Sequence, residues 1–476
     1  VAEKIRGCDI VSGILIIGGF FVFAALMIMK VLPTILALPL MAAWIAFVVQ
    51  MPLVVYLNNI LLAGAMKLGT AMAVVIFGAM FAQVIMKTGI SGTIIKKAAE
   101  LAGDKPRSIA IILSFATMFV FMGMSGLGAA IMVGSIVLPI MMSAGISPLL
   151  SSVIFLLAIQ TGLLVNAANY GTFIGIFGGE VTMSYYVPAF AISLLVSLIC
   201  IFVNIKGSTD KRESGTSFLT ILGILLKGII MLPKNICVSF YEQIAKATTA
   251  KSSSLVVKKD NVPAAALLAP ILPLVTVYVF RAVVGFGKAA EGHVDPVAAS
   301  VLGFFLASVY AILLTKPGQL INILAGSITE GIKDVAGVIF LFMGIGMLVA
   351  AVMDQTVAKV LNPLLLSIVP THPWTVFAFF AICAPTALYR GPLNMFGMGV
   401  GIAALIGTLH ILPGAVVVGT FLAVEYIQGA SDPTNSHNTW IGGFTNVDTT
   451  EILKKTLPYT WGMCLLLLLY VTLMRW

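Results

Sequence analysis

The sequence predicts an all-α, polytopic membrane protein made of two related halves, and three observations support this. The chain has 476 residues, of which 60% are hydrophobic and 9% charged, with a mean hydropathy of +1.10; soluble proteins are far more polar. Many apolar segments reach roughly 17 to 20 residues, the length of a helix that crosses a bilayer. The second half also repeats motifs of the first half.

The repeat is clearest in two pairs of motifs. Asn59-Ile60-Leu61 recurs as Asn322-Ile323-Leu324, 263 positions later, and Thr172-x-Ile174-Gly175-x-Phe177 recurs as Thr439-x-Ile441-Gly442-x-Phe444, at an offset of 267. The offset drifts by only a few residues, so we interpret the pattern as an internal duplication. Duplicated halves in a membrane chain are the usual build of a secondary transporter.

Each half contains the same succession of apolar segments. We expect three spans, two shorter arms joined by a glycine-rich tip, a span with a polar break, and a last span. The first half has spans near Asp9–Met29, Pro33–Met51, Ala71–Met86, Leu149–Val165 and Val187–Ile205, with arms at Ser108–Met122 and Ala129–Met142. The second half has spans near Pro263–Val284, Pro296–Leu314, Val335–Met353, Pro413–Gln428 and Tyr459–Met474, with arms at Trp374–Leu388 and Met395–His410. The domains are therefore a first repeat over residues 1–205, a linker over 206–261 and a second repeat over 262–476.

The two arms of each half form either one re-entrant hairpin or two full crossings. These alternatives give five or seven crossings per half, and either odd number inverts the second repeat relative to the first. Arms of roughly 15 residues with glycine-rich tips favour hairpins, because they are short for a crossing. We therefore expect two inverted repeats of about five transmembrane helices plus one re-entrant hairpin each, with broken helices at the midplane.

The linker Lys206–Asn261 is basic, with nine lysines and arginines against four acids. The positive-inside rule places it in the cytoplasm, and we interpret Phe218–Leu232 within it as an interfacial helix, with a short extra span as the alternative. Both termini then lie outside, unless a helix precedes Val1. Basic loops account for the net charge of +9, and the sequence offers no soluble basic face for nucleic acid. The expected location is the bacterial cytoplasmic (inner) membrane, with the lipid bilayer as a partner.

Polar residues inside apolar spans are the functional signal, because burying them in lipid costs several kcal/mol. Asn166–Thr172 and Ser431–Thr439 occupy equivalent places in the two halves and are poor helix formers. An unwound helix frees backbone groups that bind ions and anions. The alternative is a pair of loops at helix ends, but their presence in both halves favours a site. We expect substrate contacts from six break residues: Asn166, Asn169, Thr172, Thr434, Asn435 and Thr439.

The hairpin tips, Gly123–Gly128 and Leu388–Asn394, are the second candidate region. Glycine lets a ligand approach the backbone closely. Arg390 is the one arginine at a predicted site, and its planar guanidinium forks onto a carboxylate; the alternative is that it snorkels to the interface. The expected substrate-binding residues of the tips are Ser125, Gly126, Arg390, Gly391 and Asn394, of which Gly126 and Gly391 match in the repeat.

Glu425 lies deep in a span, and its repeat mate, 265 positions earlier, is Gln160. Only one half therefore carries a titratable group there, and a buried glutamate can carry a proton. The alternatives are a fixed partner for Arg390 or a neutral, hydrogen-bonded acid. Asp432 offers hard oxygen atoms to Na⁺ or carries a proton, and a histidine titrates near neutral pH. The expected ion-coupling residues are Gln160, Glu425, Asp432, His437 and Asn438.

Signatures of an enzyme are missing from the sequence. It has no nucleotide-binding Walker motif, no metalloprotease histidine pair and no heme cysteine pair, and its five cysteines lack metal-ligand spacing. We therefore expect no catalytic residue, no metal site and no cofactor other than a bound Na⁺. Without a nucleotide site, an ion gradient must supply the energy.

At these residues the chain resembles the ion transporter superfamily, which includes gluconate permeases, citrate and dicarboxylate transporters and some Na⁺/H⁺ antiporters. The resemblance rests on Lys30-x-x-Pro33, on Lys87-Thr-Gly-Ile-Ser-Gly followed by Ala102-Gly-Asp-Lys-Pro-Arg107, and on a hairpin followed by a broken helix rich in Asn and Thr. It implies a scaffold, a mobile transport domain, elevator-type alternating access and a homodimer. The tips read Met124-Ser-Gly and Arg390-Gly-Pro instead of the Ser-Asn-Thr signature of the dicarboxylate/sodium branch, so the sodium sites of that branch are not carried over.

The sequence therefore favours an ion-coupled secondary active transporter of a small organic anion, a carboxylate, working as a symporter with H⁺ or Na⁺. The alternative is a Na⁺/H⁺ antiporter, in which Asp432 and Glu425 bind only ions and Arg390 is structural. A channel or a non-transporting scaffold fits the paired breaks poorly. Arg390 favours the anion, because an antiporter needs only an acidic site.

Overall fold

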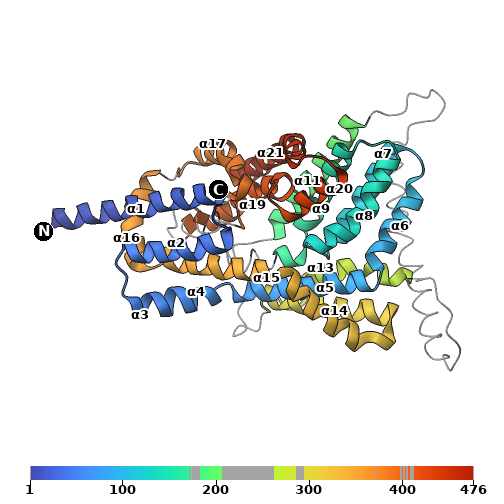
Figure 1. Ribbon diagram of the computed structural model, residues 1–476, viewed down its shortest axis with the longest axis horizontal. Helices are drawn as coiled ribbons and strands as arrows, with labels where there is room; N and C mark the ends of the chain where they lie inside the picture. The colour runs from blue at the N-terminus through green and yellow to red at the C-terminus, as the bar shows by residue number, and fades with distance from the viewer. Residues whose placement is uncertain are drawn as a thin grey trace.

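The computed structural model describes residues 2–29, 31–170, 173, 183–205, 262–285, 294–368, 370–396, 399, 402–403, 406–407 and 412–474. These residues form an elongated bundle of helices without a β-strand (Figure 1). Seven helical segments are long and apolar enough to cross a membrane: Leu53–Lys87, Tyr185–Asn204, Ala264–Val283, Pro296–Thr315, Pro317–Val352, Gly414–Thr445 and Thr449–Met474. The predicted all-α membrane fold is confirmed.

The helices follow the same order in both parts of the chain. The first part contains α1 (Ala2–Ile28), α2 (Thr34–Val48), α3 (Leu53–Val55), the π-helix η1 (Tyr56–Leu62), α4 (Ala63–Met66), α5 (Gly69–Lys87), α6 (Ile90–Ala102), α7 (Pro106–Phe121), α8 (Leu127–Ser143), α9 (Pro148–Leu164) and α11 (Met183–Asn204). The second contains η3 (Ala264–Ile271), α13 (Leu272–Val283), α14 (Pro296–Thr315), η5 (Pro317–Gln319), α15 (Leu320–Val352), α16 (Gln355–Ile368), α17 (Pro373–Cys383), η6 (Ala384–Arg390), α19 (Gly414–Ser431), α20 (Ser436–Thr445) and α21 (Thr449–Met474).

Three features differ from the expected segments or lie beyond the description. Helices α6 and α16 follow the third span of each part, and sequence analysis had treated these stretches as loops. Helix α15 begins at Leu320, well before the predicted start at Val335. The predicted linker Lys206–Asn261, with its interfacial helix, lies outside the described residues, so its cytoplasmic location stays a prediction, as does the inversion of the repeats.

Helix boundaries follow local capping chemistry. Proline occupies the first turn of α7, α9, α14 and α17, where its missing N–H removes no helical bond. The side chains of Ser147 and Asp295 accept bonds from the first turns of α9 and α14, as N-caps do. Asp448 precedes α21 and accepts a 2.6 Å bond from the backbone N–H of Thr450. This bond lowers the pKa of the Asp448 carboxyl below its usual range.

The helices pack in two groups. One, the α15 group, contains α1, α2, α4, α5, α13, α14 and α15; the other, the α19 group, contains α7, α8, α9, α11, α17, η6, α19, α20 and α21. Helices α5, α14 and α15 run together along one side of the molecule in Figure 1, opposite α17, α19 and α21. Within the α15 group, α4 meets α15 where Gly64 faces Gly346. A Cβ atom on Gly346 would lie 2.2 Å from the carbonyl oxygen of Gly64, so the two backbones touch.

Helices α9 and α19 form the centre of the α19 group and contact each other. Every residue from Ser151 to Gly162 and from Val416 to Gln428 is buried. A helix buried on all sides is surrounded by protein rather than lipid. The two spans predicted to carry breaks therefore lie inside the molecule.

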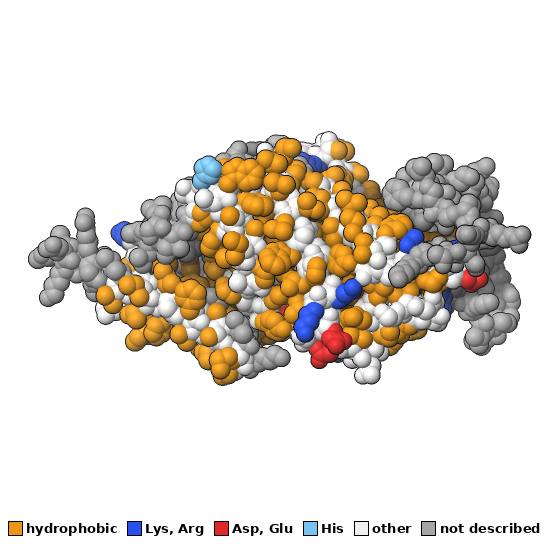
Figure 2. Space-filling model, turned by 90° about the horizontal axis from the view of Figure 1, so that it is seen from above, with side chains coloured by type: hydrophobic (Ala, Val, Ile, Leu, Met, Phe, Trp, Pro, Cys, Tyr) orange, Lys and Arg blue, Asp and Glu red, His pale blue; other side chains and the backbone are white. Residues whose placement is uncertain are grey.

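The outer surface is apolar. Figure 2 shows hydrophobic side chains over most of one face, with few charged ones. Large side chains such as Phe47 and Ile321 are more than 70% exposed, which suits contact with lipid rather than water.

Candidate functional site

The break in the first half is shorter than the sequence predicted. Helix α9 ends at Leu164, and a helical turn resumes at Ala167, so only Val165 and Asn166 are non-helical among the described residues. The expectation of an unwound stretch starting at Asn166 and running through Tyr170 is therefore wrong, because Asn166 caps the new turn itself. Thr172 lies outside the described residues, so its predicted role is untested.

The break in the second half is also short. Helix α19 continues to Ser431, and α20 begins at Ser436, which leaves Asp432–Asn435 as the break. Ser431 and the stretch Ser436–Thr439 were expected to be unwound, and this is wrong. Their polar side chains satisfy the helix backbone: the Thr439 hydroxyl donates to the Asn435 carbonyl oxygen at 3.1 Å, so a polar sequence is compatible with helix here.

The two breaks share one hydrogen-bond pattern. The Oδ1 atom of Asn166 accepts a bond from the amide two residues ahead, that of Ala168, at 2.8 Å, and Oδ1 of Asp432 accepts one from the amide of Thr434 at 2.9 Å. The side-chain amide of Asn169 then donates to the carbonyl oxygen six residues back at 3.0 Å. Asn435 does the same to Gly429 at 3.3 Å and also donates to Gln428 at 2.6 Å.

Asn166 joins the first break to the first hairpin tip. Its Nδ2 donates to the carbonyl oxygens of Phe121 at 2.9 Å and Met124 at 3.1 Å, at the end of α7. The turn into α8 passes through Gly126, whose φ of +90° suits a residue without Cβ. Ser125 is half-buried beside it. With 1% of its surface exposed, Asn166 makes the break and the tip one structural unit.

The second hairpin tip is backbone-strained. Tyr389 and Arg390 have φ values of +55° and +60°, in the left-handed region that non-glycine residues rarely adopt. Gly391 follows, and a Cβ there would lie 2.0 Å from the Thr386 carbonyl oxygen. Asn394 is fully buried, donates to the Ala387 carbonyl oxygen at 2.9 Å and accepts from the Phe396 amide at 2.9 Å. Such strain persists only where the surroundings hold it and is common in ligand sites.

Two side chains of the second break hold this tip. Oδ2 of Asp432 accepts a 3.4 Å bond from the backbone N–H of Arg390, and Oε1 of Gln428 accepts one from the backbone N–H of Met395 at 2.8 Å. Gln428 was not among the predicted residues. The available signal was a polar residue four positions before Asp432, on the same face of the helix.

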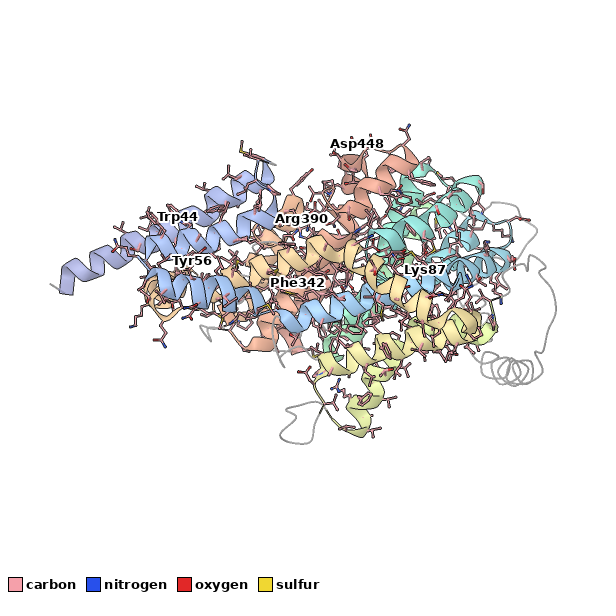
Figure 3. The ribbon with its side chains drawn as sticks, turned by 60° about the horizontal axis from the view of Figure 1, so that its bottom comes forward. Trp44, Tyr56, Lys87, Phe342, Arg390 and Asp448 are labelled. Atoms are coloured by element: carbon pink, nitrogen blue, oxygen red, sulfur yellow. The ribbon has the colours of Figure 1, made fainter. Side chains whose placement is uncertain are left out.

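Charged and titratable groups gather at the second break. Arg390 and Asp432 each interact electrostatically with His437, and the His437 ring nitrogen Nε2 lies 3.0 Å from the Gly429 carbonyl oxygen. Asp432 is fully buried and Arg390 half-buried, near the middle of the molecule in Figure 3. Among the described residues, the Arg390 guanidinium makes no ion pair.

Gln160 and Glu425 lie together in the core of the α19 group. Both side chains are buried, and the Gln160 amide hydrogen-bonds the Glu425 carboxyl. Glu425 is thus a hydrogen-bonded acid rather than the partner of Arg390. Asn438, the remaining predicted ion-coupling residue, donates to the Ala430 carbonyl oxygen at 2.9 Å. Its own Oδ1 is buried without a partner among the described residues.

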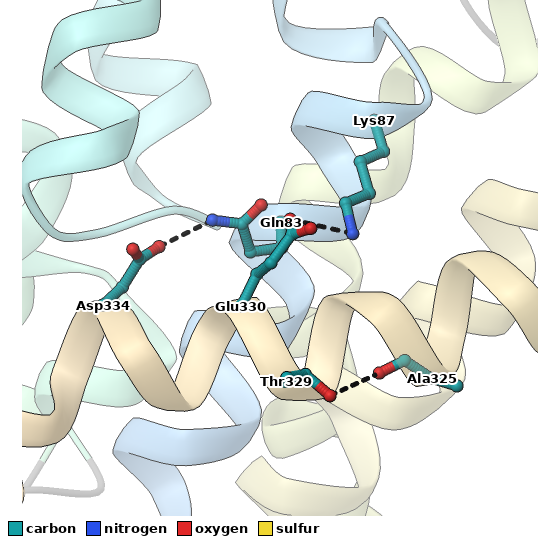
Figure 4. Close-up of polar contacts among 6 residues, drawn as sticks. All are labelled: Gln83, Lys87, Ala325, Thr329, Glu330 and Asp334. Carbon is teal, nitrogen blue, oxygen red and sulfur yellow. Dashed lines mark hydrogen bonds and ion pairs between the residues drawn. The ribbon is translucent and has the colours of Figure 1, made fainter.

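A polar cluster between α5 and α15 was missed by sequence reasoning. Lys87 forms a 2.9 Å ion pair with Glu330, and Nε2 of Gln83 donates to Oδ2 of Asp334 at 2.6 Å (Figure 4). Asp334 also faces the first tip, because its Oδ2 lies 3.6 Å from where a Cβ of Gly128 would stand. The charged pattern of Glu330, Lys333 and Asp334 in an otherwise apolar helix was the signal.

These features define a polytopic helical membrane protein in which two broken helices are each tied to a neighbouring tip. No family model matches the chain, and no curated protein matches it. Among solved structures it is similar to the crystal structure of the YdaH transporter of Alcanivorax borkumensis, described as having an unusual topology. The TM-score is 0.51 at 12% identity, over 88% of this chain and 87% of that one. The chain shares the fold of that transporter, whereas its resemblance to the ion transporter superfamily stays a prediction.

Proposed function

We propose that this protein is an ion-coupled secondary active transporter of a small organic anion, a carboxylate. The observation that carries the proposal is the Arg390 guanidinium, half-buried on a strained tip and without an ion pair among the described residues. A partly buried cation without a partner is costly. A substrate carboxylate supplies the two oxygen atoms that the guanidinium fork fits.

The surrounding groups supply the rest of the anion site. Asn394, Gly391 and the break residues Thr434 and Asn435 lie on the same tip and break as Arg390. Ser125, Gly126, Asn166, Asn169, Thr172 and Thr439 complete the proposed substrate contacts. Asp432 lies beside Arg390, and its fixed negative charge limits how much anionic charge the site accepts. This balance favours a monocarboxylate or a single carboxylate arm over a highly charged anion.

The division into two helix groups supports an elevator-type mechanism. Both tips and both breaks belong to the α19 group, so they can move together against the α15 group and carry the substrate across. Tight binding of each tip to its own break by Asn166 and Asp432 keeps the site intact during such a movement. We further propose a homodimer in a bacterial inner membrane.

Uptake of labelled carboxylates into proteoliposomes tests the proposal, with pH and Na⁺ gradients imposed separately. We expect uptake of at least one small carboxylate above that of protein-free liposomes under one of the two gradients. Gradient-driven Na⁺/H⁺ exchange without uptake of any carboxylate would replace this proposal by the antiporter alternative. The buried acids Glu425 and Asp432 are the observation that favours that alternative.

A further inference from the structure

A small closed space lies next to Glu425, between α9, α11 and α19. It has a volume of about 10 Å³, close to the roughly 10–15 Å³ that one water molecule needs. Leu163, Leu164, Phe173 and Leu422 form its apolar walls, and the rings of two tyrosines of α11 complete them. Its polar groups are Glu425, Asn169 and Tyr186.

One wall group lacks a hydrogen-bond partner. The Tyr186 side chain is only 4% exposed, and its hydroxyl has no partner among the described residues. Buried hydroxyl groups are almost always hydrogen-bonded, to protein or to ordered water. The neighbouring Tyr185 differs, because its hydroxyl donates to the Gly419 carbonyl oxygen at 2.9 Å. The unsatisfied hydroxyl therefore points to an occupant of the space beside Glu425.

The groups that face Glu425 are neutral. Gln160 of α9 hydrogen-bonds its carboxyl, and Tyr185 and Tyr186 of α11 and Tyr426 of α19 interact with it electrostatically. On α21, Cys464 and Tyr470 face Tyr185. No ion pair reaches Glu425 among the described residues. A lone buried carboxyl accommodates a proton, which removes its charge, at less cost than it bears a net charge in this apolar setting.

The same composition disfavours Na⁺. A hard cation is held by several oxygen ligands, whereas half of the residues around this space have wholly apolar side chains. One carboxyl, one hydroxyl and one amide are enough for a water molecule, which makes two to four hydrogen bonds. They form an incomplete shell for a metal ion.

We propose that this space holds one water molecule between Glu425 and Tyr186, and that Glu425 there binds the proton coupled to transport. In the binding step, a hydronium at the water position transfers its proton to the carboxylate: an O–H bond forms on Glu425, one O–H bond of the hydronium breaks, and a neutral water remains. Release is the reverse. Asn169 belongs to the first break, so the water connects the acid to the substrate region. The inference rests on the proposed transport function and assigns its coupling ion.

Infrared difference spectroscopy on the purified protein tests the site without any transport. A pH titration should show a carboxylic acid band that is lost in Glu425→Gln and shifted in Glu425→Asp, a second variant in case the first does not fold. Tyr186→Phe should shift the band frequency, since it removes one partner of the water. The matched control Tyr185→Phe deletes a hydroxyl that is already bonded to Gly419 and should leave the band in place.

Three outcomes overturn the inference: a Glu425 band that does not titrate, no shift in Tyr186→Phe, or replacement of the band when Na⁺ is added at fixed pH. The last outcome would make this a sodium site. If carboxylate uptake occurs while the band fails to titrate, only the proton site is refuted. If the band behaves as expected while no carboxylate is transported, the proposed function fails and the proton site stands.

Discussion

Gln160 hydrogen-bonds Glu425, and these two residues stand 265 positions apart, which is the spacing of the internal repeat. Equivalent residues meet in this way when a two-fold axis passes between them, as in the contacts of symmetric dimers. The contact therefore supports the predicted inversion of the two halves. It also means that one acid and one amide share a single place at the centre of the molecule.

We predict that the acid works from either side of this contact. Glu425→Gln should abolish uptake driven by a pH gradient and keep substrate exchange, because the amide mimics the protonated acid. Adding Gln160→Glu to that variant returns a carboxyl to the same place and should restore part of the pH-driven uptake. The measurement is uptake and exchange in proteoliposomes. Full pH-driven uptake by Glu425→Gln alone would assign the coupling to Asp432, His437 or Na⁺ instead.

We predict that Arg390→Lys weakens transport severely. An ammonium keeps the charge but loses the planar fork, and a charge-assisted bond contributes roughly 1.5–3 kcal/mol, which corresponds to a loss of about 10- to 100-fold in affinity. Thermal unfolding should change little, because no ion pair of Arg390 exists to be broken among the described residues. The measurement is the concentration dependence of carboxylate uptake.

Arg281→Lys is the matched control for this change. Arg281 lies at the exposed end of α13, and its replacement should leave uptake unaltered. Normal transport by Arg390→Lys would remove the main support for an organic anion and move the antiporter ahead.

We predict that Asn166→Ala loosens the first hairpin tip. The substitution removes two bonds to the carbonyl oxygens of Phe121 and Met124, and buried groups left unpaired cost about 1–3 kcal/mol each. A cysteine placed at Ser125 should then react faster with a small thiol reagent. Asn204→Ala also deletes a side-chain amide with two oxygen partners, Cys200 and Tyr459, but at the end of α11. Equal labelling rates in both variants would contradict the role given to Asn166.

We predict that Gly162→Ala destabilises the protein by about 1–3 kcal/mol through overpacking. A Cβ at this position would lie 2.5 Å from the Met118 carbonyl oxygen, on the neighbouring helix α7, which cannot rotate away as a side chain can. Gly443→Ala is the control, since nothing lies within 4 Å of its added Cβ. Thermal unfolding in detergent should show a lower midpoint for the first variant only, and equal midpoints would mean that α7 and α9 are less closely packed than described.

The sequence predicted the helical class and the places of both breaks because a polar run inside an apolar span is conspicuous. It overestimated the breaks, since Ala167 and Ser436 already lie in helix and composition does not reveal which side chains cap a new turn. It missed α6 because a short amphipathic helix resembles a charged loop. The pairing of Asp334 with Gln83 was invisible for another reason: these residues are 251 positions apart, and only packing brings them together.

The crossing of α4 and α15 at Gly64 and Gly346 has a practical consequence for anyone who wants to watch this protein work. Two backbones in direct contact cannot slide past each other without separating, so labels placed on these helices, away from the glycines, form an internal ruler of constant length. Distances measured from that ruler to a label on α8 or α20 would report the displacement of the tips alone. A signal that changes between the two ruler labels themselves would expose an artefact of labelling or of the detergent.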